Sequence, residues 1–205
     1  LVVQWQVLNG TWTDISGATG LTYSAPTTTA GTTQYRARIV ETSSGCSTPF
    51  SNIVTVVIRE DATVTSATAN PEVCVGGTSI INATVSGGSS GLILQWQSSP
   101  DDINWSNIPD ANITSYSAPT TTPGTTYYRV IITDPLPDCS DPVSNSLSII
   151  VQPDATVSVN PTTSEICLGG TSLLTATITG GSGALLIEWQ SNTNGGGWQV
   201  VAGAT

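Results

Sequence analysis

The cysteines are the residues of this chain whose type and spacing most directly permit chemistry. Cys46 and Cys139 lie 93 positions apart, and so do Cys74 and Cys167. Two cysteines per period in a repetitive, cysteine-poor chain are typical of one disulfide per repeat in an exported protein. The predicted pair is Cys74 with Cys139, which on the chain-entropy model stabilises the fold by about 4 kcal/mol. We expect Cys46 and Cys167 to pair with residues outside this sequence.

Acidic residues form a second candidate site. Asp134, Asp138 and Asp141 crowd one loop, and Glu60 and Asp61 lie in a linker that we expect to be near it. Carboxylate oxygens converging there would suit Ca²⁺. The corresponding loop one period earlier carries a single acid, so we prefer a solvated acidic loop and predict no cofactor. Zinc is not expected, because the chain has no histidine and no C-x-x-C spacing.

Side chains that usually perform catalysis are scarce. The chain has no histidine, and its four basic residues are all arginine. Its serines and threonines therefore lack a base to activate them, and Asp101 and Asp102 fit a solvated turn. We predict no enzyme activity. A net charge of −10 disfavours nucleic acid as a partner, and no apolar run is long enough to span a membrane.

An internal repeat organises the chain. The segment Ser115–Ile132 recurs almost unchanged at Thr22–Ile39, 93 positions upstream. This period predicts three domains. Residues 1–60 are the C-terminal part of a partial repeat, 61–153 a complete repeat, and 154–205 the N-terminal part of another. We call them repeats one, two and three, and we expect them to belong to a longer array.

Strand patterns recur through repeat two at the 8–12-residue spacing of a sandwich, and no helical period survives the Thr, Gly and Pro content. The predicted fold class is all-β: tandem immunoglobulin-like antiparallel β-sandwiches with about seven strands per ~93-residue repeat. The expected strands cover residues 62–69, 79–86, 92–98, 105–108, 113–117, 125–133 and 143–151.

Aromatic residues are predicted to anchor the cores of the three repeats. The core anchors are Trp5, Trp96, Trp189, Tyr35 and Tyr128. A further tryptophan of each repeat, Trp12, Trp105 and Trp198, lies on an expected edge hairpin. Burial is the preferred interpretation of these three, and an exposed contact residue that stacks on sugars is the alternative.

The repeated segment itself is predicted to be a corner between two sheets. Pro119 and Pro123 cannot donate hydrogen bonds to the interior of a sheet, so the chain should cross there from one sheet to the other. Beyond Gly124 the alternation resumes, with Tyr128, Val130 and Ile132 on one face. A tyrosine corner at Tyr35 and Tyr128 would tie this turn to the strand that follows.

This topology leaves the cysteine assignment open. In an immunoglobulin-like strand order, the positions of Cys74 and Cys139 lie at opposite ends of one domain. A disulfide between neighbouring repeats would satisfy that order, with every partner outside the sequence. Free thiols are the third alternative.

Several segments resemble the immunoglobulin-like repeats of giant surface proteins in gliding bacteria of the Bacteroidetes type. They are W-Q-S-S-x-D-x-x-x-W-x-x-I-x-x-A (Trp96 to Ala111), P-x-T-T-Y-Y-R-V, C-S-x-x-V-S-N-x-L-x-I, and N-P-x-x-x-I-C-x-G-G-T-S, complete at Asn160–Ser172. The resemblance implies type IX secretion, location at the extracellular cell surface, and a role in adhesion, gliding or filaments. Repeat one departs from the pattern at Leu8–Thr11, where its hairpin is two residues shorter.

The sequence therefore predicts a structural stalk or filament segment of a large secreted adhesin or appendage. Its expected partners are neighbouring repeats of the same chain, with a lateral homo-oligomer as an extension. A carbohydrate-binding module and an accessory module of a secreted hydrolase are the alternatives.

Overall fold

The computed structural model describes residues 2–41, 47–181, 183 and 185–204. Every regular element among these residues is a β-strand, and none of them forms a helix that could cross a membrane. The chain divides into two compact units. Unit 1 contains Leu1–Thr63, Ser86–Leu92 and Thr133–Asp141, and unit 2 contains Val64–Val85, Ile93–Ile132 and Pro142–Thr205.

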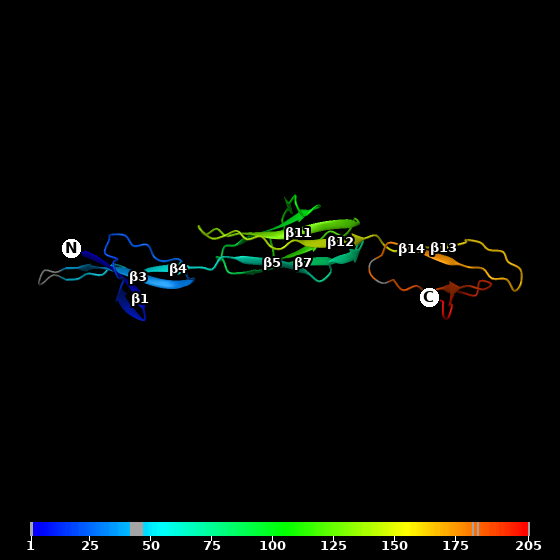
Figure 1. The fold of residues 1–205 in the computed structure, drawn as a ribbon, viewed down its shortest axis with the longest axis horizontal. Helices are drawn as coiled ribbons and strands as arrows, with labels where there is room; N and C mark the ends of the chain where they lie inside the picture. The colour runs from blue at the N-terminus through cyan, green and yellow to red at the C-terminus, as the bar shows by residue number, and fades with distance from the viewer. Residues whose placement is uncertain (1, 42–46, 182, 184, 205) are drawn as a thin grey trace. The chain divides into compact units, whose positions relative to one another are not determined.

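Repeat two forms a two-layered sandwich (Figure 1). A three-stranded sheet has the order β10-β7-β5, and a five-stranded sheet has the order β6-β12-β11-β8-β9. The predicted all-β class and immunoglobulin-like sandwich are confirmed. The strands are β5 (Thr63–Thr68), β6 (Glu72–Cys74), β7 (Ser79–Ser86), β8 (Ile93–Ser99), β9 (Ser106–Asn107), β10 (Ser115–Ala118), β11 (Gly124–Thr133) and β12 (Leu147–Gln152).

Alternation of side chains fills the core between the two sheets. Along β11, Tyr128, Val130 and Ile132 are buried, as predicted from their period of two. Trp96 of β8 is completely buried, and Ile81 of β7 meets the core from the other sheet. Both sheets therefore contribute an apolar inner face, which is the condition for a stable sandwich.

The predicted corner between the sheets is confirmed. Strand β10 pairs with β7 in the smaller sheet, and β11 pairs with β12 in the larger one. The chain crosses between them through residues 119–123, which include both prolines. The crossing lies at the prolines because they cannot donate backbone hydrogen bonds to either ladder.

Two features of the larger sheet differ from the sequence prediction. The short strand β6 was not predicted, and it pairs with β12 in parallel. Strand β12 begins at Leu147, whereas residues from Val143 were expected. The reason is that Ser144 Oγ accepts the N–H of Val130 at 3.0 Å, so a side chain replaces a ladder bond there.

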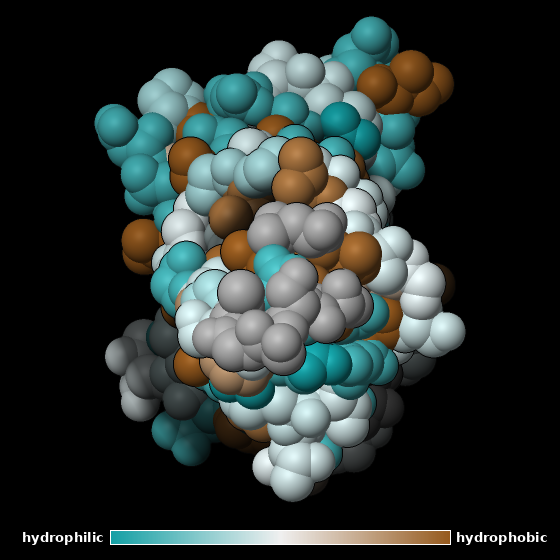
Figure 2. Space-filling view, turned by 90° about the vertical axis from the view of Figure 1, so that its left-hand side faces the viewer, coloured by the Kyte–Doolittle hydropathy of each residue, from teal (hydrophilic) through white to brown (hydrophobic). Residues whose placement is uncertain are grey.

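Repeats one and three each show fewer layers among the described residues. Repeat one is a single sheet of order β2-β1-β3-β4, made of β1 (Val2–Asn9), β2 (Thr11–Asp14), β3 (Gly31–Val40) and β4 (Val54–Ile58). Repeat three has two separate pairs, β13 (Thr156–Asn160) with β14 (Thr175–Thr179), and β15 (Gln190–Ser191) with β16 (Gln199–Val200). Most apolar residues of repeat one are half-buried, and most of those described in repeat three are exposed. In Figure 2 the hydrophobic residues appear as separate spots among polar ones.

Candidate functional site

The linker that enters repeat two is held by a glycine turn. The N–H of Gly88 donates to the carbonyl oxygen of Glu60 at 2.9 Å. Gly87 has a φ of 74°, and a Cβ at this position would collide with the carbonyl oxygen of Asp61. Only glycine combines this left-handed backbone with so close an approach. The turn therefore fixes the linker backbone at Glu60 and Asp61.

The linker that enters repeat three is held in the same way. The N–H of Gly181 donates to the carbonyl oxygen of Pro153 at 2.7 Å. A Cβ on Gly180 would collide with the carbonyl oxygen of Asp154. Since Gly180 and Gly181 lie 93 positions after Gly87 and Gly88, this contact is a property of the repeat.

Carboxylates complete the network around the first linker. Asp134 accepts the N–H of Ser89 at 2.8 Å and the N–H of Leu136 at 3.0 Å. Its hydrogen bonds with Ser89, followed by the one from Leu136, hold the pKa of Asp134 below its usual range. Asp61 accepts the N–H of Ser140 at 3.2 Å. Linker, glycine turn and acidic loop all belong to unit 1 and form one hydrogen-bonded assembly.

The five residues considered for Ca²⁺ do not form a ligand cluster. Among the described residues, no three acidic or cysteine side chains come close enough together to hold a metal ion. Asp134 and Asp61 accept the backbone bonds given above, and Asp141 accepts the N–H of Asp134 at 2.8 Å. These carboxylates therefore accept backbone hydrogen bonds around the linker. The five acidic residues considered for Ca²⁺ are Glu60, Asp61, Asp134, Asp138 and Asp141.

The predicted Cys74–Cys139 disulfide is not formed, because Cys139 carries a free thiol. Strand order explains the failure. Cys74 lies opposite Gln152, at the end of β12 that pairs with the first residue of β11. Cys139 lies in the loop that follows the last residue of β11. Cys167 is exposed, and Cys46 falls outside the described residues.

The tryptophans of the edge hairpins are partly covered. The guanidinium of Arg129 lies 4.2 Å from the ring centre of Trp105, and that of Arg36 lies 4.3 Å from Trp12. Each arginine occupies one face of the indole ring through a cation–π contact. Trp198 in repeat three is 69% exposed. Two of the three tryptophans, Trp12 and Trp105, therefore contact an arginine of their own repeat.

The predicted core anchors of repeat two belong to a row of three aromatic rings. The ring centres of Trp96 and Tyr116 are 6.4 Å apart, and those of Tyr116 and Tyr128 are 5.9 Å apart. Burial, with a smaller contribution from Tyr116, raises the pKa of Tyr128 to about 12. Tyr35 is buried in repeat one, whereas Trp5 and Trp189 are half-buried.

Comparison with known families identifies the repeats. A family described as "Domain of unknown function (DUF8696)" matches residues 2–60 and again residues 63–153. The chain belongs to the DUF8696 family. A search of curated proteins finds no match.

Two solved structures are similar to this DUF8696 chain. An amphioxus IgVJ-C2 molecule shares 11% identity over 73% of this chain and 88% of its own, with a TM-score of 0.42. Fibronectin(III)-like modules of Clostridium thermocellum CbhA share 18% identity over 73% of this chain and 77% of their own, with a TM-score of 0.28. The fold assignment rests on the two sheets of repeat two.

Sequence reasoning missed the residues that hold the linkers of these DUF8696 repeats. Gly87 and Gly88 are not among the residues that the sequence analysis above names. Their recurrence at Gly180 and Gly181, each pair 26 positions after a linker aspartate, was the available signal. That signal carries no distance, so only the structure shows that the turn contacts the linker.

Proposed function

We propose that this chain is a structural segment of an extracellular stalk or filament, built from tandem repeats that are held in a semi-rigid array. It acts mechanically, by projecting or connecting other parts of a large surface adhesin or appendage. Its main partners are the neighbouring repeats of its own chain. This function needs no catalytic residue and no cofactor.

The short linkers are the observation that carries this proposal. Strand β4 ends at Ile58 and the first held linker residue is Glu60, so only Arg59 lies between them. After repeat two, β12 ends at Gln152 and the held residue Pro153 follows directly. A linker with one free residue or none has few backbone torsions left to rotate, so successive repeats are expected to move together.

The chemistry of the surface supports an extracellular structural role. Only 9% of the residues are charged, and all four basic residues are arginine. Lysine on strand edges discourages association between sheets, and this chain has none. We therefore include side-by-side association of arrays into a multi-chain filament at the bacterial cell surface, following export by the type IX route that the sequence resemblance implies.

A carbohydrate-binding role is less well supported by the positions of the tryptophans. Sugar stacking needs an open indole face, and Arg36 and Arg129 cover one face of Trp12 and Trp105. A role as accessory module of a hydrolase would place the repeats in a secreted enzyme and not in a stalk or filament on the cell surface.

Electron microscopy with antibodies raised against this 205-residue chain tests the proposal. We expect label along threads on intact cells of the source organism. Label confined to the cell interior, or to a soluble secreted enzyme, would contradict it. A glycan array on which the chain binds sugars through Trp12 or Trp105 would favour the carbohydrate alternative.

A further inference from the structure

The outer edge of β4 in repeat one has no partner strand among the described residues. In repeat two, the corresponding strand β12 lies between β11 and β6. In repeat one, β4 ends its sheet after β3. Val57 of β4 is 53% exposed, whereas its counterpart Ile150 of β12 is half-buried. An open strand edge offers backbone donors and acceptors to another extended segment.

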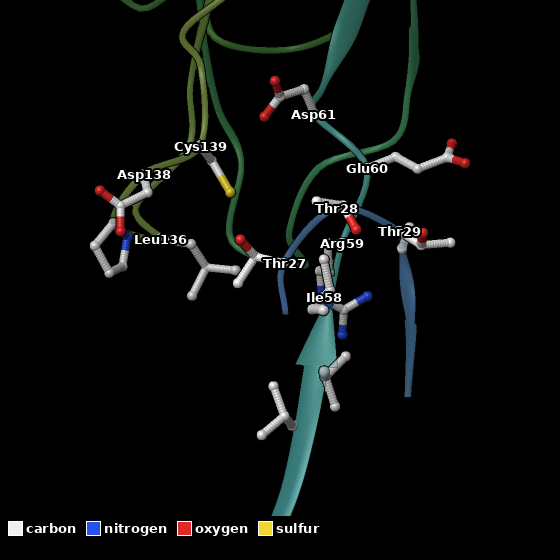
Figure 3. Close-up of a pocket in the computed structure, with 14 residues that line it drawn as sticks. Thr27, Thr28, Thr29, Ile58, Arg59, Glu60, Asp61, Leu136, Asp138 and Cys139 are labelled. Carbon is white, nitrogen blue, oxygen red and sulfur yellow. The ribbon is translucent and has the colours of Figure 1, made fainter. Parts of the chain in front are cut away.

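A cavity of about 920 Å³ lies beside this edge (Figure 3). Its lining comes from residues 27–30, 56–61 and 136–139, all of which belong to unit 1. Figure 3 shows the sulfur of Cys139 pointing into the cavity, with Thr27 and Arg59 among the residues around it. The edge of β4 and a free thiol therefore meet in one hollow.

Repeat two shows what fills the equivalent place. There β6 lies along β12, and the chain after it continues to bind the same surface. The N–H of Val75 donates to the carbonyl oxygen of Gln152 at 3.0 Å, and the N–H of Gly76 donates to that of Thr120 at 3.0 Å. The segment has the sequence E-V-C-V-G-G, and repeat three contains E-I-C-L-G-G. The residues that hold it have counterparts 93 positions earlier, at Thr27 and Arg59.

Charge favours the same kind of segment on β4. In repeat two, Gln152 donates from Nε2 to the carboxylate of Glu72 at 2.8 Å. Arg59 stands at the position of Gln152 in repeat one and is exposed. A guanidinium facing the glutamate of an incoming E-x-C-x-G-G segment would form a charge-assisted hydrogen bond. Such a bond is stronger than the hydrogen bond that the neutral side-chain amide of Gln152 donates to Glu72.

We propose that the edge of β4 and the cavity beside it bind an extended E-x-C-x-G-G segment that precedes β1 in the same repeat, and that Cys139 forms a disulfide with its cysteine. The acidic loop of each repeat would then be tied covalently to the edge strand of the repeat before it. This inference deepens the proposed array and rests on it for the succession of repeats.

If the segment pairs with β4 in the register that β6 has on β12, its cysteine sulfur lies near the sulfur of Cys139. In repeat two the cysteine of the segment lies opposite Gln152, so on β4 it would lie opposite Arg59. Arg59 and Cys139 line the same cavity, and a disulfide needs Cα atoms about 4.4–6.8 Å apart. Forming the bond removes two protons and two electrons from two thiols. A disulfide-class oxidant accepts them and becomes two thiols.

The test uses the 205-residue chain and a peptide of sequence N-P-E-V-C-V-G-G-T, whose cysteine carries a thionitrobenzoate leaving group. One protein variant keeps only Cys139, through Cys46→Ser, Cys74→Ser and Cys167→Ser. The matched control keeps only the exposed Cys167. The Cys139 thiolate attacks the peptide sulfur and expels thionitrobenzoate, which is followed by absorbance, while mass spectrometry locates the adduct.

We expect the peptide to label Cys139 at least about tenfold faster than a scrambled peptide with the same residues, because docking raises the effective concentration of the sulfur. Cys167 should not distinguish the two peptides. Replacing the peptide glutamate with alanine, or Arg59→Ala in the protein, should remove part of the advantage. The comparisons between peptides use the same folded protein, so a folding defect cannot produce a difference between them.

Equal rates for matched and scrambled peptides at Cys139 would overturn the proposal. Disulfide-linked dimers between Cys139 and Cys167 of the unmodified chain, forming as fast as the peptide adduct, would assign the edge to a second copy instead. Neither outcome affects the array itself, because the stiffness of the linker is measured separately in a cysteine-free background.

Discussion

In repeat two the ring centres of Tyr116 and Tyr128 lie 5.9 Å apart, and in repeat one those of Tyr23 and Tyr35 lie 5.7 Å apart. The indole N–H groups behave alike too. Trp96 donates to a backbone carbonyl at 2.9 Å, and Trp5 does so at 3.0 Å. Yet Trp96 is completely buried and Trp5 only half-buried.

This comparison separates two sources of structure. The aromatic row, the indole hydrogen bond and the arginine over the hairpin tryptophan all occur in repeat one, where the described residues form a single sheet, although in repeat two Tyr116 belongs to β10 of the smaller sheet. Burial of the inner face depends on the second sheet, which repeat two has and which the described part of repeat one lacks. The aromatic contacts are therefore alike in the two repeats, whereas most of the burial that stabilises repeat two comes from its second sheet.

The largest expected difference is between Trp96→Ala and Trp5→Ala. Removing a fully buried tryptophan costs about 3–5 kcal/mol, and the half-buried Trp5 should cost less than half of that. Hydrogen exchange resolved by residue measures the loss of stability in each repeat separately. Similar losses would show that burial by the second sheet does not decide the stability of the aromatic row.

A second comparison concerns Gly87→Ala at the first linker and Gly10→Ala in a hairpin turn. Both glycines have φ near 74°, but only Gly87 lies against another backbone carbonyl. We expect Gly10→Ala to cost about 1 kcal/mol through backbone strain and Gly87→Ala about 2–3 kcal/mol through strain and collision. Denaturant unfolding measures both. Equal losses would mean that the turn does not press on the linker.

Asn145 links the two sheets of repeat two. It accepts the N–H of Ser66 at 2.9 Å and donates to the carbonyl oxygen of Ser66 at 3.0 Å. Asn145→Ala should destabilise repeat two by about 1–2 kcal/mol. Its counterpart Asn52→Ala, in the single sheet of repeat one, should cost less than about 0.5 kcal/mol. An equal loss at Asn52 would refute a cross-sheet role for this asparagine.

The smallest effect appears only in alkali. The pKa of Tyr128 is raised from 10.0 to about 12 by burial, so the folded state disfavours the phenolate. The contribution of this group to stability is complete below pH 10 and is lost as the pH rises towards 12. Unfolding measured across this range should show a smaller decline for Tyr128→Phe. An unchanged decline would contradict the assignment.

Much of the fold of repeat two could be predicted from the sequence, because the alternation in Thr125–Thr133 and the prolines at 119 and 123 report on local constraints. The strand β6 could not be predicted, since three residues between Pro71 and a glycine turn carry no period. Its parallel pairing depends on β12, more than 70 residues later.

The candidate site was predicted less well. The acidic residues were correctly expected near the linker, but the sequence could not say that Asp134 and Asp61 would accept backbone N–H groups. The Cys74–Cys139 pair is not formed in the structure. Cysteine counting favoured this pair, whereas the immunoglobulin-like strand order already placed the two cysteines at opposite ends of one domain. The contact of the glycine turns with the linkers could not be predicted, because it depends on the approach of segments 26 residues apart in the sequence.

The central claim is that a held linker makes successive repeats move together. It is tested most directly by electron-spin distance measurements between labels at Thr13→Cys and Ser106→Cys, equivalent exposed positions of repeats one and two. The four native cysteines are replaced by serine. The comparison is with the same protein carrying Gly-Gly-Ser-Gly-Ser between Ile58 and Arg59. We predict a narrow distance distribution for the native linker and a clearly broader one after the insertion. Equally broad distributions in both proteins would contradict the account.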